Sequence, residues 1–142
     1  MQVYPPLSTQ VIGQAESALG ALLDPILART ETSFQQWLVL TVSAAGGGEL
    51  DRSELVGRIS GARKIGGAEV EAAIDQLRAT GLAEGGDRVT LTEVGRDRYA
   101  QIRGAIDELT ARLFDFPAED LETAGRVLSI VTARANAELT AG

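Results

Sequence analysis

The chain has 142 residues and a formal net charge of −7, and its composition is 44% hydrophobic but only 4% aromatic. This length suits one compact domain, and a core built from Leu, Ile, Val and Ala favours packed helices over aromatic-rich strands. Cysteine and histidine are both absent, which excludes disulfides, thiolate metal sites and the commonest general base. We therefore expect no metal and no other cofactor.

The first part of the sequence predicts two long helices followed by a short one. Ser8–Ala28 carries apolar residues at spacings of three and four, and Pro25 predicts a kink or a restart near its end. Phe34–Ala45 is apolar on nearly every face, as is typical of a central buried helix. Gly46–Gly48 ends that helix, and a short helix then starts at Asp51–Glu54.

A loop, a further helix and a hairpin are predicted next. The loop contains Gly61, Arg63, Lys64, Gly66 and Gly67. It leads to a helix over about residues 68–80, and Gly81 stands where a left-handed residue commonly ends a helix. Two brief extended runs, Leu82–Glu84 and Arg88–Leu91, flank a turn of two glycines and an aspartate, which indicates a β-hairpin.

Two long helices complete the chain. Thr92 is the expected N-cap of the first, and Pro117–Asp120 opens the second. Both carry apolar stripes at spacings of three and four, which pack helix against helix. The stripes bury either against the chain's own core or in a dimer interface. We favour the dimer, because two such helices exceed what one small domain needs to cover itself.

The predicted fold class is mostly α with a small β-hairpin. A winged helix-turn-helix core over about residues 33–92 is flanked by dimerisation helices over about 8–30 and 93–140, within one domain spanning 1–142. Residues 1–9 lack the features of a signal peptide, and no stretch approaches the roughly 20 apolar residues that cross a bilayer. We expect a cytoplasmic protein with no membrane partner.

Five segments resemble MarR-type winged-helix transcriptional regulators, in order along nearly the whole chain. They are Phe34–Leu40, Ser53–Val56, Leu77–Leu82, Val89–Gly95 and Pro117–Leu128. In that family they correspond to the buried second helix, the first helix of the helix-turn-helix, the end of the recognition helix, the last wing strand and the final helix. The segment Val89–Gly95 is the one most specific to that family.

The resemblance implies a DNA-binding homodimer whose two recognition helices enter successive major grooves of double-stranded DNA. It also implies a small aromatic effector that releases the DNA, bound near Trp37, Leu38 and Tyr99. The alternative for Trp37 is an ordinary core residue. The implied DNA-binding residues lie on the recognition helix, just before it and on the wing. They are Arg63, Lys64, Gly67, Ala68, Glu71, Ala72 and Arg88.

Two departures from the family pattern bear on DNA binding. The expected groove-facing positions carry Ala, Gly and two Glu residues, Glu69 and Glu71, where the family usually places Ser, Thr, Arg or Gln. The wing is short, although Asp87-Arg88 matches the family's Asp-Arg pair. An alternative function is therefore a winged-helix protein-interaction or ligand-sensing module that has lost tight DNA binding.

An enzyme is not predicted. Without His or Cys, catalysis would depend on carboxylates, hydroxyls, tyrosine or Lys64. Glu69 and Glu71 are two residues apart and do not share a helix face. Glu119 and Asp120 lie in the first turn of a helix, where the helix dipole accounts for them. The sequence identifies neither the operator nor the effector.

Overall fold

The computed structural model describes residues 3–141 and divides the chain into two compact units, Met1–Ile106 and Asp107–Gly142. The described residues form six helices and three short strands. They are α1 (Thr9–Ala28), α2 (Phe34–Ala45), β1 (Glu49–Asp51), α3 (Arg52–Arg63), α4 (Gly67–Ala79), β2 (Ala83–Glu84), β3 (Arg88–Leu91), α5 (Glu93–Leu113) and α6 (Ala118–Ala141). The predicted mostly helical winged-helix fold is confirmed.

Helix α1 begins at its predicted cap, where the Ser8 side chain accepts a hydrogen bond from the Val11 N–H at 3.2 Å. It runs through Pro25 as one helix, so the predicted restart does not occur. Among the described helices, α1 alone is long and apolar enough to cross a membrane, by length and composition only. This finding concerns length and mean composition alone, because α1 is not an unbroken apolar stretch and includes Glu16 and Asp24.

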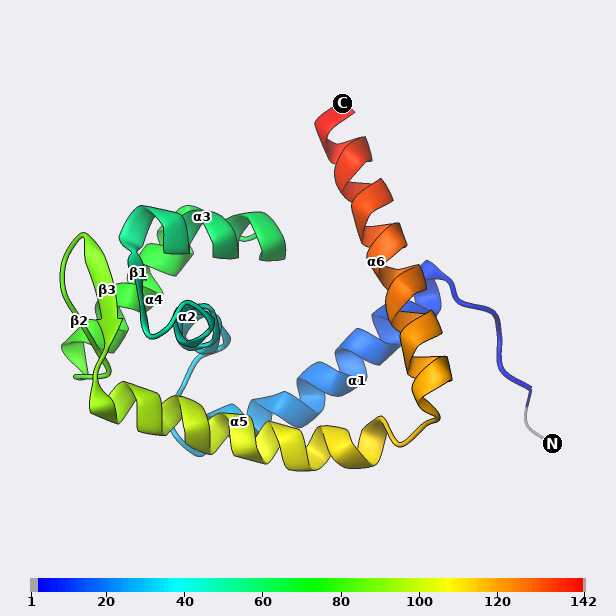
Figure 1. The fold of residues 1–142 in the computed structure, drawn as a ribbon, viewed down its shortest axis with the longest axis horizontal. Coiled ribbons are helices and arrows are strands. Elements are labelled where there is room, and N and C mark those ends of the chain that lie inside the picture. The colour runs from blue at the N-terminus through cyan, green and yellow to red at the C-terminus, as the bar shows by residue number, and fades with distance from the viewer. Residues whose placement is uncertain (1–2, 142) are drawn as a thin grey trace. The chain divides into compact units, whose positions relative to one another are not determined.

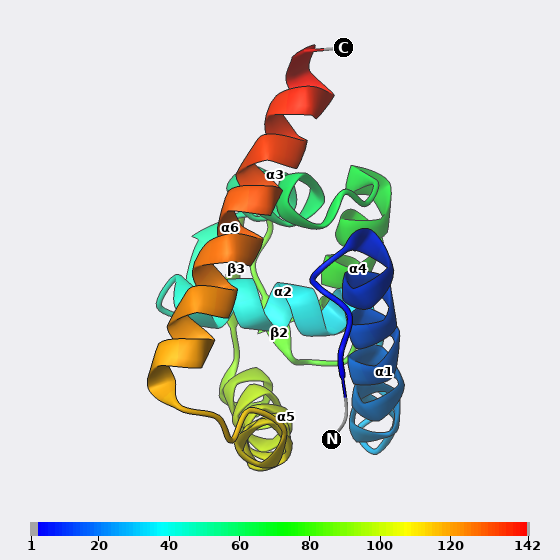
Figure 2. The same cartoon turned by 90° about the vertical axis from the view of Figure 1, so that its right-hand side faces the viewer.

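Helix α2 is the centre of the first unit, as its apolar sequence predicts. In Figures 1 and 2 it lies between α3 and the first part of α5, and it also contacts α4. Ser33 and Gln36 form a reciprocal capping box at its start. Val39 and Leu40 are fully buried, so this helix supplies much of the core.

The wing belongs to a three-stranded antiparallel sheet in which β3 lies between β1 and β2. The sequence predicted β2 and β3 but missed β1, whose Asp51 pairs with Arg88 of β3. At the turn, Gly85 has φ +93°, and a Cβ there would lie 2.0 Å from the Arg88 carbonyl oxygen. Only glycine accepts both constraints without strain.

Helices α3 and α4 form the helix-turn-helix. Contrary to the prediction, Gly61 and Arg63 belong to α3, which ends at the left-handed Lys64. The left-handed residue predicted to end α4 is confirmed, because Gly81, just after the C-cap Thr80, has φ +81°. The Leu82 N–H reaches the Leu77 carbonyl at 2.9 Å and the Gly81 N–H reaches that of Arg78 at 3.2 Å, forming a Schellman motif.

Helix α5 starts at the predicted cap, where Thr92 Oγ1 accepts the Gly95 N–H at 3.0 Å. The boundary between the two compact units falls within α5. In the second unit the Pro117 carbonyl accepts hydrogen bonds from the Asp120 and Leu121 N–H groups in the first turn of α6. None of the described residues of α6 is buried, and several of its large apolar side chains, Leu128 and Val131 among them, are exposed.

Candidate nucleic-acid interface

The outer face of α4 is acidic and lined with small residues. Its inner face buries four apolar side chains, Val70, Ala73, Ile74 and Leu77. Of the α4 residues predicted to face DNA, Ala68, Glu71 and Ala72 are exposed and Gly67 is half-buried. The structure therefore leaves the predicted face accessible. Alanine and glycine bring the backbone close to a neighbouring surface but offer no hydrogen bonds.

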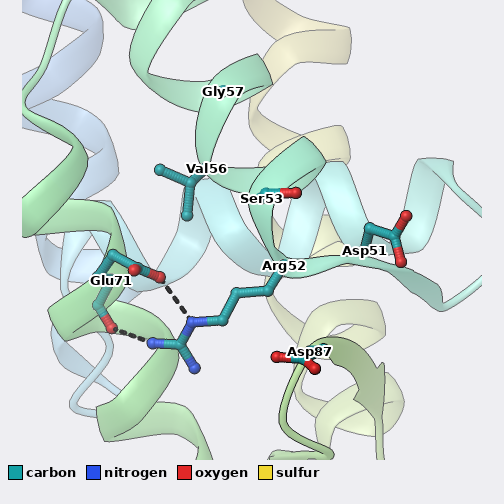
Figure 3. Close-up of a pocket in the computed structure, with 7 residues that line it drawn as sticks. All are labelled: Asp51, Arg52, Ser53, Val56, Gly57, Glu71 and Asp87. Atoms are coloured by element: carbon teal, nitrogen blue, oxygen red, sulfur yellow. Dashed lines mark hydrogen bonds and ion pairs between the residues drawn. The ribbon is translucent and has the colours of Figure 1, made fainter.

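Arg52, at the first turn of α3, is held by two carboxylates of α4. Its Nε lies 2.6 Å from Glu71 Oε1 (Figure 3). Its Nη2 lies 2.8 Å from Asp75 Oδ1. These contacts raise the pKa of Arg52 above its ordinary value, the Asp75 hydrogen bond contributing most and that of Glu71 next. We call these three residues the Arg52 cluster.

The Arg52 cluster borders a hollow of about 640 Å³ between α3, α4 and the wing turn. The hollow is lined by Asp51, Arg52, Ser53, Val56, Gly57, Glu71 and Asp87 (Figure 3). The Arg52 backbone N–H donates to the Asp87 carbonyl at 2.7 Å, so the wing turn is joined to the start of α3. The cluster thus fixes α4 against α3, beside the wing.

One of the two carboxylates that the sequence analysis counted against DNA binding, Glu71, therefore has a structural role, and it shares that role with Asp75. Glu71 and Asp75 face Arg52, and Asp75 also lies 3.7 Å from Arg78. The sequence contained one indication of this arrangement. Glu71 and Asp75 are four residues apart and so lie on one stripe of the helix, where a single cation can meet both.

Arg88 lies on the wing, as predicted, but it is paired with carboxylates of β1. Its Nε is 2.9 Å from Glu49 Oε1, and its Nη1 is 3.6 Å from Asp51 Oδ1. The side chain remains 58% exposed. A phosphate contact by Arg88 would therefore compete with these two carboxylates.

Arg63 and Lys64 lie at the turn between α3 and α4, and both are exposed. The Arg63 guanidinium lies 5.1 Å from the centre of the Phe34 ring, a cation–π contact. Lys64 Nζ donates to the Gly61 carbonyl at 2.6 Å. Neither pairs with a carboxylate within residues 3–141, so these two cations are more available to an external anion than Arg52 or Arg88.

Two of the residues expected to bind an effector, Trp37 and Tyr99, contact each other in the first unit. The rings of Trp37 and Tyr99 are stacked, with centroids 5.5 Å apart and planes 18° apart. Trp37 is only 6% exposed, whereas Tyr99 and Leu38 are half-buried. The sequence nominated Trp37 and Tyr99 separately, and their contact depends on the packing of α2 against α5.

The described residues contain no group of three or more metal-ligating Asp, Glu, His or Cys side chains. The polar side chain of Ser43 is fully buried, and its Oγ has no hydrogen-bond partner among the described residues. This hydroxyl lies inside α2, and nothing places it near the exposed face of α4. It adds no chemistry to that face.

No protein-family model matches this chain, and no curated protein matches its sequence significantly. Among solved structures, ligand-free NadR superposes with a TM-score of 0.75 at 23% identity over 92% of this chain and 99% of NadR. NadR has also been solved with 4-hydroxyphenylacetate, at a TM-score of 0.71, 22% identity and coverage of 92% and 98%.

Two further structures are described as MarR proteins. Sco5413, a MarR family transcriptional regulator from Streptomyces coelicolor, has a TM-score of 0.72 at 18% identity, covering 89% of this chain and 91% of its own. Staphylococcus aureus MarR with salicylate and kanamycin gives 0.71 at 19% identity, with coverage of 85% and 84%.

The helix-turn-helix, the wing and the helices at both ends define the chain as a winged-helix protein with helical extensions. More particularly, its fold is that of the MarR-type transcriptional regulators, which confirms at the level of the fold the resemblance found in the sequence.

Proposed function

We propose that this chain is a cytoplasmic DNA-binding transcriptional regulator that acts as a homodimer. The observation that carries the proposal is the MarR-type fold, which 89% of the chain shares with Sco5413. A helix-turn-helix binds DNA by placing its second helix in the major groove, and the outer face of α4 is accessible for that contact. No catalytic role is proposed.

The interface would combine contacts to the DNA phosphates with close approach of α4 to the major groove. Arg63 and Lys64 precede α4 and would bind phosphate, while Arg88 would reach the DNA from the wing. Gly67, Ala68 and Ala72 would lie against the groove, where their small size permits contact. Glu71 would act through Arg52, by holding α4 in place.

The first test is selection of genomic DNA by the purified chain, followed by titrations at two salt concentrations. We expect enrichment of a pseudo-palindrome, because a two-fold dimer reads two half-sites. Affinity should fall steeply with salt. Arg88→Ala should weaken binding and flatten the dependence of log K on log salt by about 0.9 for each phosphate contact removed.

Glu49→Gln is the matched variant for Arg88. It removes the carboxylate 2.9 Å from Arg88 Nε and leaves the arginine in place, so affinity should rise roughly two- to fivefold. If both variants leave the affinity and its salt dependence unchanged, Arg88 does not contact DNA. If the folded wild-type protein enriches no sequence, the proposed function itself is wrong.

The second candidate function is a protein-interaction or ligand-sensing module without tight DNA binding. It is favoured by the pairing of Arg52, Arg58, Arg78 and Arg88 with carboxylates, and by the net charge of −7. A phosphate must displace each such carboxylate, which lowers DNA affinity. A stable dimer that binds an aromatic ligand but no DNA at low salt would support this candidate.

We propose further that a small aromatic molecule is the effector, binding against Trp37, Leu38 and Tyr99. Support comes from NadR and S. aureus MarR, which were solved with 4-hydroxyphenylacetate and with salicylate respectively. The stacked pair offers a flat aromatic surface, and the Tyr99 ring is partly accessible. Binding would shift the dimer toward a state with lower DNA affinity.

Trp37 is the single tryptophan of the chain, so its fluorescence reports directly on this site. Titration with salicylate or 4-hydroxyphenylacetate should quench it saturably, and the same ligand should lower DNA affinity. Tyr99→Ala removes the stacking partner and should weaken ligand binding about two- to tenfold. Val94→Ala, at an exposed position on the same helix, is the control and should leave ligand affinity unchanged.

The proposal is contradicted if the quenching does not saturate and rises with ligand concentration as steeply as the quenching of free N-acetyltryptophanamide. That result would show that the ligand only absorbs light or quenches by collision. It would exclude an effector site at Trp37 and Tyr99.

A further inference from the structure

The three carboxylates of α4 differ in their surroundings. Glu71 and Asp75 belong to the Arg52 cluster, at 2.6 and 2.8 Å from its guanidinium nitrogens. Glu69 is exposed and has no ion pair or side-chain hydrogen bond within residues 3–141. Glu69 is therefore the one described α4 carboxylate whose acceptors are all available to an external donor.

Glu69 lies on a flank of α4 different from that of Glu71. With Ala72 and Gln76 it lines a hollow of about 280 Å³, which also includes Ser33 and Gln35 near the start of α2. Gln76 is held there by Gln36, whose Nε2 donates to its Oε1 at 3.0 Å. Glu69 is thus a carboxylate beside small neighbours, in the first turn of the helix that a helix-turn-helix inserts into the groove.

A free carboxylate at this position discriminates between bases. It only accepts hydrogen bonds, and in the major groove cytosine presents a lone amino donor at N4. Guanine presents two acceptors there, which repel a carboxylate. Adenine places its N7 acceptor beside the N6 donor, so it suits an amide better than a carboxylate.

We propose that Glu69 is a specificity-determining residue that selects cytosine in each half-site by accepting a hydrogen bond from its N4 amino group. The inference rests on the proposed function, because it requires α4 to enter the major groove. The Gly and Ala residues around Glu69 bring the helix close, and its carboxylate then supplies the readout that they lack. The Arg52 cluster keeps Glu71 from competing for the same base.

The test is selection from a randomised duplex library with the full-length chain, comparing wild type, Glu69→Gln and Glu71→Gln. Wild type should select cytosine at one position of each half-site. Glu69→Gln should select adenine there, since Gln pairs with adenine N6 and N7, and it should lose about tenfold in affinity for the wild-type site. All other positions of the motif should stay the same.

Glu71→Gln is the matched control, because it makes the same chemical change two residues along the same helix. It should still select cytosine at this position, while the loss of its ion pair with Arg52 lowers the overall DNA affinity. If wild type and Glu69→Gln select the same motif, or if Glu71→Gln alters the same position as Glu69→Gln, the assignment of Glu69 is overturned while the proposed function stands. If none of the three proteins selects a motif at low salt, both the proposed function and this inference are overturned.

Discussion

Gly95→Ala is expected to destabilise the winged-helix unit by about 3 kcal/mol and to lower its melting temperature by roughly 10 °C. A Cβ at Gly95 would lie 2.0 Å from the Leu82 carbonyl oxygen and 3.0 Å from its carbon. These are backbone atoms, so relief of the clash must move either the start of α5 or the segment that follows α4. The measurement is thermal unfolding followed by circular dichroism.

The Leu82 carbonyl cannot move freely, because it accepts the Thr92 N–H at 3.0 Å. Thr92 Oγ1 in turn donates to the Gly81 carbonyl at 2.7 Å and accepts the Gly95 N–H at 3.0 Å. Displacing Leu82 therefore disturbs the cap of α5 and the end of α4 together. This coupling makes the expected loss larger than that of an ordinary overpacked side chain.

Gly104→Ala, on the same helix, is expected to stabilise the protein instead. A Cβ at Gly104 meets no atom within 4 Å, so the change only removes the backbone freedom of a helical glycine. Stability should rise by about 0.5–1 kcal/mol. A loss of similar size for both variants would indicate that glycine matters in α5 generally, and would contradict the role assigned to the contact between Gly95 and Leu82.

The sequence was most informative where one local pattern determines the structure. Gly81 takes the left-handed conformation that its position after a helix predicts, and Thr92 caps α5 through its side chain. Both features depend on residues within five positions along the chain. The special role of Gly95 in the phrase Val89–Gly95 has a tertiary cause, its contact with Leu82, which no local rule could supply.

The sequence was least informative where partners are distant. Strand β1 has three residues, too few to show a periodicity, and it forms only by pairing with β3 some forty residues later. Because β1 was missed, the pairing of Arg88 with Glu49 was missed as well. The Arg52 cluster was not predicted for the same reason, because Arg52 lies on α3 and its carboxylate partners lie on α4.

One assignment failed for a different reason. Gly61 was predicted to lie in the loop before α4, but it lies inside α3, where a Cβ would meet nothing within 4 Å. The helix continues to Arg63, and it is Lys64 that takes the left-handed conformation, with φ 57°. Glycine is favoured at such positions but is not required there, so composition alone misplaced the end of α3.

Charged substitutions in the exposed apolar stripe of α6 are expected to dissociate the proposed homodimer. Leu128 and Val131 are 39% and 41% exposed, and they lie on the three-four stripe that the sequence predicts to pack against another helix. Leu128→Glu combined with Val131→Glu would place four carboxylates in one symmetric interface, two from each protomer. Since buried unpaired charges are strongly unfavourable, dimer affinity should fall more than about a hundredfold.

Light scattering at micromolar concentration measures this directly. Wild type should have twice the protomer mass of 14.9 kDa, and the double variant should have the protomer mass alone. Ala133→Glu combined with Ala137→Glu is the matched control. It adds the same charge to the same helix, at positions that the helical repeat places on the opposite face. The control should remain dimeric and, if the proposed function holds, should retain DNA affinity.

The two double variants together separate an interface effect from an effect of charge. If both dissociate, added negative charge on α6 is sufficient, and the stripe has no special role. If neither does, the dimer is held by other elements, of which α1, with Leu19 and Leu22 each 41% exposed, is the next to test. If wild type is itself a monomer, the homodimer is excluded. One result supports the proposal: the Leu128→Glu, Val131→Glu variant alone becomes a monomer and also loses DNA binding. That result would show that the apolar face of α6 forms the dimer that binds two half-sites.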